Sequence, residues 1–360
     1  MKGTPKILFI HNSLQTYNHA IYEMMNEVYD ITHAYVEKNE VKSANYKFFE
    51  FPHWHVGPFV IHRKLRRIIN QYDIVIINAH LRSLRIALLP FLPHKPKLIS
   101  WSIGLHVTYN KKYNLEKAPD LADRVFQSIQ NHCDACIFYM PEPIEFWKKY
   151  STIDEKKYFV AHNTVKVANF DELPPIEKRD KYLFVGTLYQ QKGLGELIEA
   201  YSLAKKSCDN LFKLYIVGKG PEENLIKDLI EKKGLSNAIV MTGAIYDEEV
   251  LMDYFLTSRL CISPKQAGLS VQKSLGYGTP FVTRPNAITG GERLDIIDKN
   301  NGFFYNTVKE LADILVNAAV NPNLIEQMSK NARNYYLSEA SPQKMVDGAL
   351  AAINYVLNKR

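Results

Sequence analysis

The feature that most constrains this chain is the alternation of short apolar, β-rich runs with amphipathic helical segments along its whole length. Such runs occupy residues 7–11 and 74–78 in the first half, and residues 182–186 and 212–217 in the second. Buried strands separated by helices are typical of parallel sheets whose strands are joined by crossover helices. Two such series in 360 residues predict an α/β protein with two doubly wound, Rossmann-like domains.

A polar segment without sustained periodicity, which contains Pro174 and Pro175, separates the two series. It divides the chain into an N-terminal domain, a linker, a C-terminal domain and a last helix, at residues 1–165, 166–180, 181–338 and 339–360. The last helix carries Met345, Ala349 and Ile353 on one face and is expected to cross back to the N-terminal domain. Ligands of such sheets bind beyond the carboxyl ends of the strands, so two facing domains would form a cleft. This architecture also suits an epimerase, a phosphorylase or a binding protein.

The formal net charge of +7 and the pI of about 8.9 suit anionic small molecules, anionic lipid surfaces or nucleic acid as partners. No RNA- or DNA-binding motif is visible, and we expect no nucleic acid partner. The four cysteines are expected to be reduced core thiols, because Cys133 and Cys136 lack a second ligand pair at zinc spacing. No run approaches the ~18 apolar residues of a membrane span, so we expect a cytoplasmic protein.

The second half carries a series of short motifs at the ends of its expected strands. In chain order they are Gly186-Thr187-Leu188, Gln191-Lys192-Gly193, Val217-Gly218-Lys219-Gly220-Pro221, Gly243-Ala244-Ile245, Gly268-Leu269 and Gly278-Thr279-Pro280. In this order and spacing, the second half resembles the retaining GT-B glycosyltransferases of family four over nearly all its length. It is most similar to a polysaccharide-assembly branch of that family. In the first half, only residues 160–163 match the family.

The resemblance implies a GT-B fold and the transfer of a hexose, with retention, from a nucleotide-diphosphate sugar to a glycan or lipid-linked acceptor. It places the donor on the C-terminal domain and the acceptor on the N-terminal domain, in cell-surface polysaccharide assembly. No metal or other cofactor is expected, and no Asp-x-Asp metal motif occurs. The residues expected at the donor are Gly186, Thr187, Lys192, Gly218, Ile245, Lys265, Gly268, Leu269, Lys273 and Glu292.

Lys192 is the first of three residues expected to be catalytic, the others being Lys273 and His106. It follows the carboxyl end of the expected strand 182–186, where the family's equivalent lysine contacts the donor phosphates. The amides of Gly268 and Leu269, just before a helix, would offer further donors to an anion. Such groups would stabilise the charge that forms on the leaving diphosphate. The alternative is a solvated loop lysine.

Three positions depart from the family pattern. Its Glu-x7-Glu pair falls on Lys265 and Lys273, and its phosphate-contacting arginine falls on Thr187. The second glutamate of the family accepts hydrogen bonds from ribose hydroxyls, which a lysine cannot do. The two lysines could instead donate to phosphate or sugar oxygens, or be ordinary surface residues. These losses leave open a second function, that of a non-catalytic nucleotide-sugar-binding or partner subunit. An epimerase would need acidic and histidine groups over the sugar, and no convincing set is visible.

Two further residues could reach the reacting sugar. His106 lies on a loop where many family members carry a histidine, but alignment by the neighbouring glycine places that histidine on Ile103. A solvent-exposed or capping role for His106 therefore stays open. Glu292 follows Gly290-Gly291 and could contact the sugar, while Asp295 could cap a helix.

Residues 47–71 combine aromatic and basic side chains. If this segment were helical, Ile61 and Leu65 would share an apolar face, and Arg63, Arg66 and Arg67 would share a basic one. That combination suits peripheral attachment to an anionic membrane surface. The alternative is an ordinary core-facing helix with a charged outer face.

Overall fold

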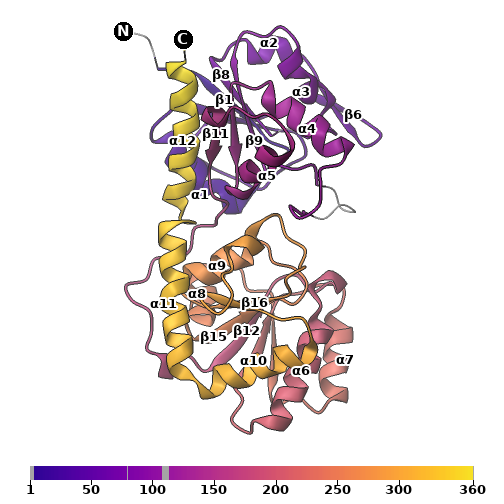
Figure 1. Ribbon diagram of the computed structural model, residues 1–360, viewed down its shortest axis with the longest axis vertical. Coiled ribbons are helices and arrows are strands. Elements are labelled where there is room, and N and C mark those ends of the chain that lie inside the picture. Colours follow the sequence, from indigo (N-terminus) through magenta and orange to yellow (C-terminus); the bar gives the residue numbers. More distant parts are fainter. Residues whose placement is uncertain (1–3, 79, 108–112, 360) are drawn as a thin grey trace. The chain divides into compact units, whose positions relative to one another are not determined.

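The computed structural model describes residues 4–78, 80–107 and 113–359. It divides into two compact units, the first made of Met1–Lys166 with Pro342–Arg360 and the second of Val167–Ser341. Each unit is built on one large parallel sheet (Figure 1). The predicted α/β fold with two doubly wound, Rossmann-like halves is confirmed.

The first unit has a seven-stranded sheet of order β11-β10-β9-β8-β1-β3-β5, in which every neighbouring pair is parallel. Its strands are β1 (Ile7–Ile10), β3 (Ile31–Tyr35), β5 (Phe48–Glu50), β8 (Ile74–Ile77), β9 (Lys97–Ser102), β10 (Ala135–Phe138) and β11 (Tyr158–Val160). The chain starts in the middle at β1, runs outward to β5 and returns to the other side of β1 at β8. Strand order therefore reverses between β1 and β8.

Helices and two small sheets complete the first unit. The helices are α1 (His19–Asn26), α2 (Leu65–Ile69), α3 (Leu84–Leu88), α4 (Leu121–Asn131), α5 (Glu142–Tyr150) and α12 (Pro342–Asn358), with a 3₁₀ turn η2 (Leu89–Phe91) after α3. The small sheets are β2 (Ser13–Leu14) with β4 (Lys38–Asn39), and the hairpin of β6 (His53–Val56) with β7 (Phe59–His62).

The hairpin corrects the assumption that Ile61 and Leu65 lie on one helix. Ile61 lies in β7, and helix is confined to the single turn or so of α2. Aromatic and β-branched residues favour strands, and Gly57 adopts the left-handed φ of +55° at the turn between β6 and β7. The aromatic side chains of this segment thus belong to strands rather than to a helix face.

The second unit has a six-stranded parallel sheet of order β14-β13-β12-β15-β16-β17. Its strands are β12 (Lys181–Val185), β13 (Lys213–Val217), β14 (Ile239–Gly243), β15 (Ser258–Ile262), β16 (Phe281–Thr283) and β17 (Gly302–Phe304). Its helices are α6 (Leu194–Ser207), α7 (Glu223–Lys232), α8 (Glu248–Leu256), α9 (Ser270–Gly276), α10 (Val308–Val320) and α11 (Pro322–Ser338). Here strand order reverses between β12 and β15.

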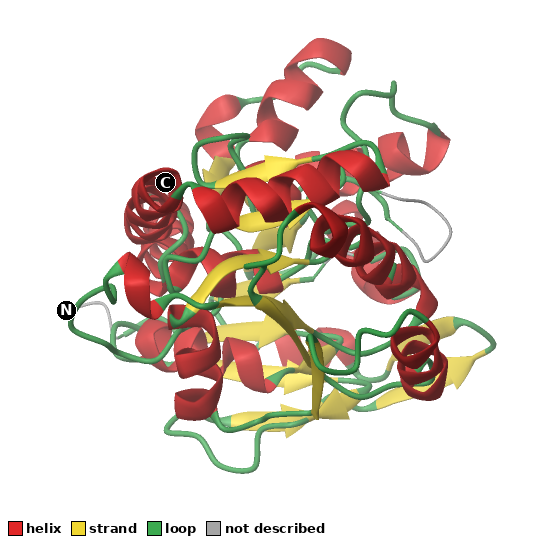
Figure 2. Ribbon diagram, turned by 90° about the horizontal axis from the view of Figure 1, so that it is seen from below, coloured by secondary structure: helices red, strands yellow, loops and turns green. Residues whose placement is uncertain are grey.

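Both faces of the second sheet are covered by helices, which explains why its strands are apolar without interruption. In β12, Tyr182 and Phe184 pack in a cluster with α6, α7 and α10, whereas Leu183 packs in a cluster with α8, α9 and α11. Figure 2 shows helices flanking the strands. Successive side chains of β12 therefore point to opposite faces of the sheet, and both of these faces are buried.

The segments around the unit boundary contribute buried residues to both cores. Helix α12 packs in the first unit, where Met345, Ala349 and Ile353 are buried in the cluster that contains residues of β1, β9 and β10. The segment expected to be a linker, residues 166–180, belongs to the second unit from Val167 onward. Val167 and Ile176 are buried there. Burial of their apolar side chains stabilises the packing of this segment, although it also contains Pro174 and Pro175.

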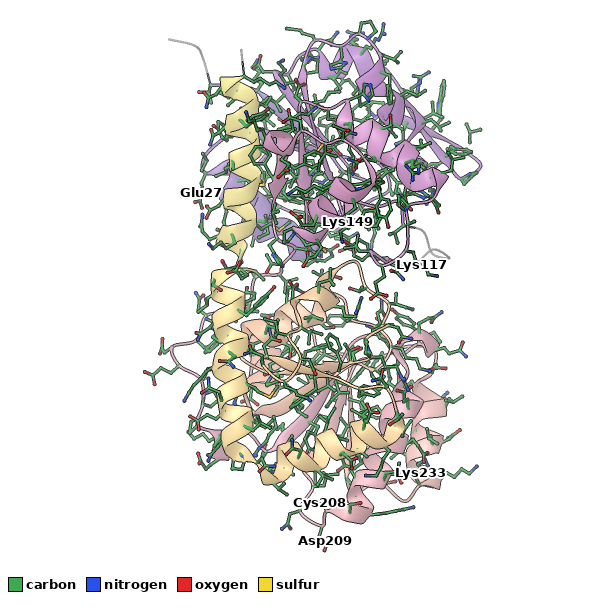
Figure 3. All side chains as sticks on the ribbon, viewed as in Figure 1. Glu27, Lys117, Lys149, Cys208, Asp209 and Lys233 are labelled. Carbon is green, nitrogen blue, oxygen red and sulfur yellow. The ribbon has the colours of Figure 1, made fainter. Side chains whose placement is uncertain are left out.

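The cysteines are all free thiols. Cys133 and Cys136 are buried, and their thiols donate to the carbonyl oxygens of Ile129 and Gln130. Burial raises the pKa of both thiols. Cys208, labelled in Figure 3, follows α6 at the edge of the second unit.

Two absences hold within residues 4–78, 80–107 and 113–359. There, no helix combines the length and the continuous apolar surface needed to traverse a bilayer. No group of three or more His, Cys, Asp or Glu side chains is arranged to hold a metal ion.

Candidate functional site

The carboxyl ends of β12 and β15 mark the point in the second unit where strand order reverses, which is where open α/β sheets bind ligands. The loops that follow these two strands are in contact. The Lys265 amide donates to the Lys192 carbonyl over 3.3 Å. Gly193 has a φ of +74°, and a Cβ on it would lie 2.8 Å from Lys265 Cγ. The structure therefore brings together two lysines that are far apart in the sequence.

Lys192 ends the 3₁₀ turn η5 (Gln190–Lys192), and its side chain is buried, with 9% of the residue exposed. A Cβ on Gly186 would lie 3.3 Å from Lys192 Nζ, so the ammonium lies over the backbone at the end of β12. Burial lowers the pKa of this ammonium. Among the described residues, no carboxylate lies within ion-pair distance of it. A buried cation without a counter-ion attracts an anion, and its burial argues against a solvated loop lysine.

Glycines allow the backbone segments next to Lys192 to pack closely. Gly186 and Gly218 have φ values of +154° and +155°, and a Cβ on Gly218 would lie 1.9 Å from the Gly186 carbonyl oxygen. The Gly218 amide in turn donates to the Gly243 carbonyl over 2.8 Å. The ends of β12, β13 and β14 are thus held in contact, and no larger residue than glycine fits at residue 218.

Other residues expected at the donor lie around the ends of these strands. Thr187 is exposed directly after Gly186, and Ile245 is half-buried beyond β14. The amides of Gly268 and Leu269 form no hydrogen bond with another described residue. The hydroxyl of Ser270, at the start of α9, is buried without a partner. Helix α9 has only seven residues, so its dipole is small. The amide and hydroxyl donors before and at its start would therefore contribute more to the binding of an anion than the dipole would.

Lys265 is tied to a carboxylate that anchors several loops. Glu196, on the first turn of α6, accepts from Arg284 Nε over 2.7 Å and from the Tyr305 hydroxyl over 2.8 Å. Lys265 Nζ lies 3.8 Å from the same carboxylate, and half of its side chain is exposed. Glu196 therefore positions the loop after β15, and Lys265 remains accessible.

Lys273 has a close acidic partner that the sequence analysis missed. Its Nζ lies 2.6 Å from Glu248 Oε2, and the Tyr277 hydroxyl donates to Glu248 Oε1 over 2.5 Å. Glu248 begins α8, directly beyond β14. The sequence carries one signal for this partner, since a lysine replaces the family's carboxylate at residue 273 and an acidic residue begins the helix after another strand of the same sheet. An ionised carboxylate has about four acceptor positions, so Glu248 can accept further hydrogen bonds.

The carboxylate of Glu292 accepts hydrogen bonds within its own loop. Its Oε2 accepts from the Gly290 amide over 2.8 Å and from the Thr289 hydroxyl over 3.0 Å, and 6% of the residue is exposed. Burial raises the pKa of this carboxyl. Asp295, expected to cap a helix, is buried and accepts from the Tyr335 hydroxyl over 2.8 Å. Glu292 thus shapes the turn after β16 through its carboxylate.

His106 lies in the first unit, beyond the carboxyl end of β9. Its amide donates to Asp123 Oδ1 over 3.0 Å, and its ring centre lies 6.3 Å from that of His80. Asp123 also forms a capping box with Asp120 at the start of α4. His106 and His80 thus share the carboxyl edge of the first sheet.

Comparison with known proteins relates this site to one family. Residues 166–335 match the family Glycosyl transferases group 1. The alpha-monoglucosyldiacylglycerol synthase of Acholeplasma laidlawii is 28% identical over 155 residues, which are 42% of this chain and 37% of that protein. The chain therefore covers well under half the length of this curated relative.

Solved structures extend the similarity in fold to both units. HepE of Anabaena, in complex with UDP, has a TM-score of 0.71 and 14% identity, over 97% of this chain and 99% of that chain. WaaG, a glycosyltransferase involved in lipopolysaccharide biosynthesis, has a TM-score of 0.62 and 15% identity, over 95% and 98% of the two chains. At these identities the likeness shows the fold.

Proposed function

Because residues 166–335 belong to the group 1 glycosyl transferases and the chain has the GT-B fold, we propose that it transfers a hexose from a nucleotide-diphosphate sugar to a saccharide or lipid-linked acceptor. The observation that carries the proposal is the buried ammonium of Lys192 where strand order reverses, which has no carboxylate partner among the described residues. A diphosphate is the anionic part of such a donor. Retention of the sugar's configuration and a role in cell-surface polysaccharide assembly are part of the proposal.

The diphosphate would bind between the loops that follow β12 and β15. Lys192 would contact the phosphates as a point charge, and the Gly268 and Leu269 amides would donate to their oxygens. Lys265 is accessible for the same role. These groups would stabilise the leaving diphosphate as its charge grows, and the transfer would need no metal.

The ribose would bind beside Lys273. This lysine cannot accept a hydrogen bond, but its partner Glu248 can. We propose that Glu248 supplies the carboxylate that the family places at residue 273, and that Lys273 and Tyr277 hold it in place. Lys273 would then be a positioning residue for the donor rather than a group that touches the reacting sugar.

The acceptor is proposed to bind the first unit, with His106 at the carboxyl edge of its sheet. Names of similar proteins support a saccharide or lipid-linked acceptor, since one synthesises a glucosylated diacylglycerol and another acts in lipopolysaccharide biosynthesis. Crystals of HepE with UDP-glucose support a uridine donor. We also propose that the protein works at the cytoplasmic face of a membrane.

A second candidate is a non-catalytic nucleotide-sugar-binding subunit of a glycan-assembly complex. The lysines at residues 265 and 273 and the threonine at residue 187 favour it, because each replaces a donor contact of the family. An anion site at Lys192 would suit both candidates. Turnover therefore has to be measured separately from binding.

A thermal-shift screen against UDP, GDP, dTDP and CMP sugars tests the proposal first. The expected result is stabilisation by one nucleoside diphosphate sugar, through mass action on the folded state. Transfer or slow hydrolysis of that donor would then establish an enzyme. Binding without any turnover would favour the non-catalytic subunit, and no shift with any donor would contradict both candidates.

A further inference from the structure

A cavity in the first unit is lined by none of the residues of the candidate functional site. It has a volume of about 370 Å³ and is lined by residues that begin α2 and by residues of α3 and η2. Figure 1 shows α2 and α3 at the same end of this unit as strand β6. Helix α3 packs against β7, so the β6–β7 hairpin borders the same region.

The cavity is cationic. Its basic lining residues are Lys64, Arg66, Arg67 and Arg85. None of the four forms an ion pair within the described part of the chain. Arg85 donates to the His62 carbonyl over 2.9 Å, which fixes one guanidinium at the wall. Residues 51–92 contain six Lys or Arg and one acid, a net charge of +5 in a chain whose total is +7.

Apolar side chains share this wall with the cations. Leu88 and Leu92 line the cavity and are 56% and 46% exposed, and Leu89 lines it from a buried position. On the neighbouring hairpin, Trp54 and Val56 are 55% and 60% exposed. Large apolar side chains that are grouped on one surface are typical of an interaction site, whereas single exposed ones are common on any protein.

The hairpin carries its own basic group. The Arg63 guanidinium lies 4.6 Å from the centre of the Trp54 ring, and Arg82 donates to the Pro58 carbonyl over 2.7 Å. A tryptophan with an arginine beside it is typical of the interface between lipid headgroups and acyl chains. The cations and the exposed apolar side chains therefore lie on the hairpin, on α2 and α3, and on the segments that adjoin them.

We propose that this cavity binds the phosphate of an anionic membrane lipid. Arg66, Arg67 and Lys64 would contact the phosphate, and Leu88 and Leu92 would contact the start of the acyl chains. The hairpin would lie in the headgroup layer beside it. A free phosphate would satisfy the cations but leave the apolar side chains in water, which is why the occupant is a lipid. This inference deepens the proposed membrane attachment and does not depend on the transfer reaction.

Vesicle flotation with the full chain tests the inference. Vesicles of phosphatidylcholine alone are compared with vesicles that also contain phosphatidylglycerol, at low and high salt. Arg66→Ala/Arg67→Ala should bind the anionic vesicles about 30-fold more weakly, since each basic residue near such a surface contributes about 1 kcal/mol. Both arginines are exposed and unpaired, so the variant should fold, with circular dichroism as the check.

Two further variants separate this cavity from general surface charge. Lys227→Ala/Lys232→Ala removes two exposed, unpaired lysines from α7 in the second unit and should leave vesicle binding unchanged. Leu88→Ser/Leu92→Ser keeps every charge and should weaken binding roughly tenfold, because about half of each leucine is available for burial in lipid.

Short-chain, soluble phosphatidylglycerol and inorganic phosphate are then compared as ligands by chemical-shift perturbation. The inference requires that the lipid perturbs residues 64–67 and 85–92 and that inorganic phosphate at the same concentration does not. Equal effects of the two ligands, or unchanged vesicle binding by Arg66→Ala/Arg67→Ala, would overturn it. Nucleotide-induced thermal shifts are recorded on the same samples, so a failed donor site and a failed lipid site are distinguished.

Discussion

Replacing Lys192 by methionine tests the anion site with little change in side-chain volume. Without nucleotide, Lys192→Met should unfold at the same or a higher urea concentration than the wild type, because the change removes a buried ammonium that has no carboxylate partner among the described residues. Most mutations that remove a contact have the opposite effect on stability. Stability without ligand is therefore the first measurement.

With nucleotide, the expected change is large. Unit charges about 4 Å apart attract each other by about 4 kcal/mol at an effective dielectric constant of about 20. Much of the desolvation of the Lys192 ammonium has already occurred in the unliganded fold, since the side chain is buried there. We therefore expect a loss of about 3 kcal/mol, or roughly 100-fold, in nucleoside diphosphate affinity and in single-turnover transfer.

Lys265→Met is the matched control. Its ammonium is half exposed and 3.8 Å from Glu196, so the same change there should weaken binding by about 1 kcal/mol or less. Calorimetry measures the affinities for the nucleoside diphosphate, and single-turnover assays measure the rates of sugar transfer. A Lys192→Met protein that is destabilised without ligand but binds nucleotide within about threefold of wild type would show that Lys192 is a structural residue.

The same lysine predicts a pH dependence of binding. Burial lowers the pKa of Lys192 below its ordinary value of 10.5. The charged form binds the anion, so affinity should fall as pH rises through that lowered pKa. The decrease should be absent in Lys192→Met, and a wild-type affinity that stays constant up to pH 10.5 would contradict it.

Three other predictions follow from the geometry. Gly218→Ala should prevent folding of the second unit or destabilise it by more than about 3 kcal/mol, because its Cβ would lie 1.9 Å from the Gly186 carbonyl oxygen; solubility and circular dichroism measure this. Glu248→Ala should weaken binding of ribose nucleotides roughly tenfold but leave binding of 2′,3′-dideoxy analogues unchanged, as calorimetry would show; an equal loss for both would contradict a ribose contact. Burial lowers the pKa of His33 from 6.5 to about 3, so the unfolded chain binds more protons below pH 6.5. This residue should thus contribute a fall in stability of about 2 kcal/mol between pH 7 and pH 5. Urea titration should find a fall about 2 kcal/mol smaller in His33→Asn, in which the buried His11, whose pKa burial also lowers, still contributes.

The fold could be predicted because the central strands of both large sheets are buried on both faces. Residues 182–185 are apolar in succession, as a central parallel strand requires, and the short loops between strands and helices kept the pattern visible. Residues 47–71 were harder, since Ile61, Leu65 and Ile68 have helical spacing although Ile61 lies in a hairpin. Helical spacing over so few residues does not exclude a strand and a short helix in succession.

The site could be predicted only in part. The lysine at residue 192 was visible from its position after a strand, but its burial depends on the loop after β15, which approaches from about 70 residues further along the chain. Glu248 depends on how α8 and α9 pack, and no local pattern in the sequence reports that contact. Glu292 could have contacted a ligand or its own turn, and only the three-dimensional structure distinguishes the two.

The return of α12 to the first unit has a consequence for biosynthesis. A ribosome completes residues 167–341, the whole second unit, before it makes the helix that closes the core of the first. Gly348 packs so tightly that a Cβ there would lie 1.8 Å from the Val160 carbonyl oxygen, so this helix is an integral layer of the first unit. Nascent chains must therefore keep one face of the N-terminal sheet uncovered until α12 has been made, and that face is where a chaperone would bind. A chain that stopped before Pro342 would have an intact second unit and an open first one.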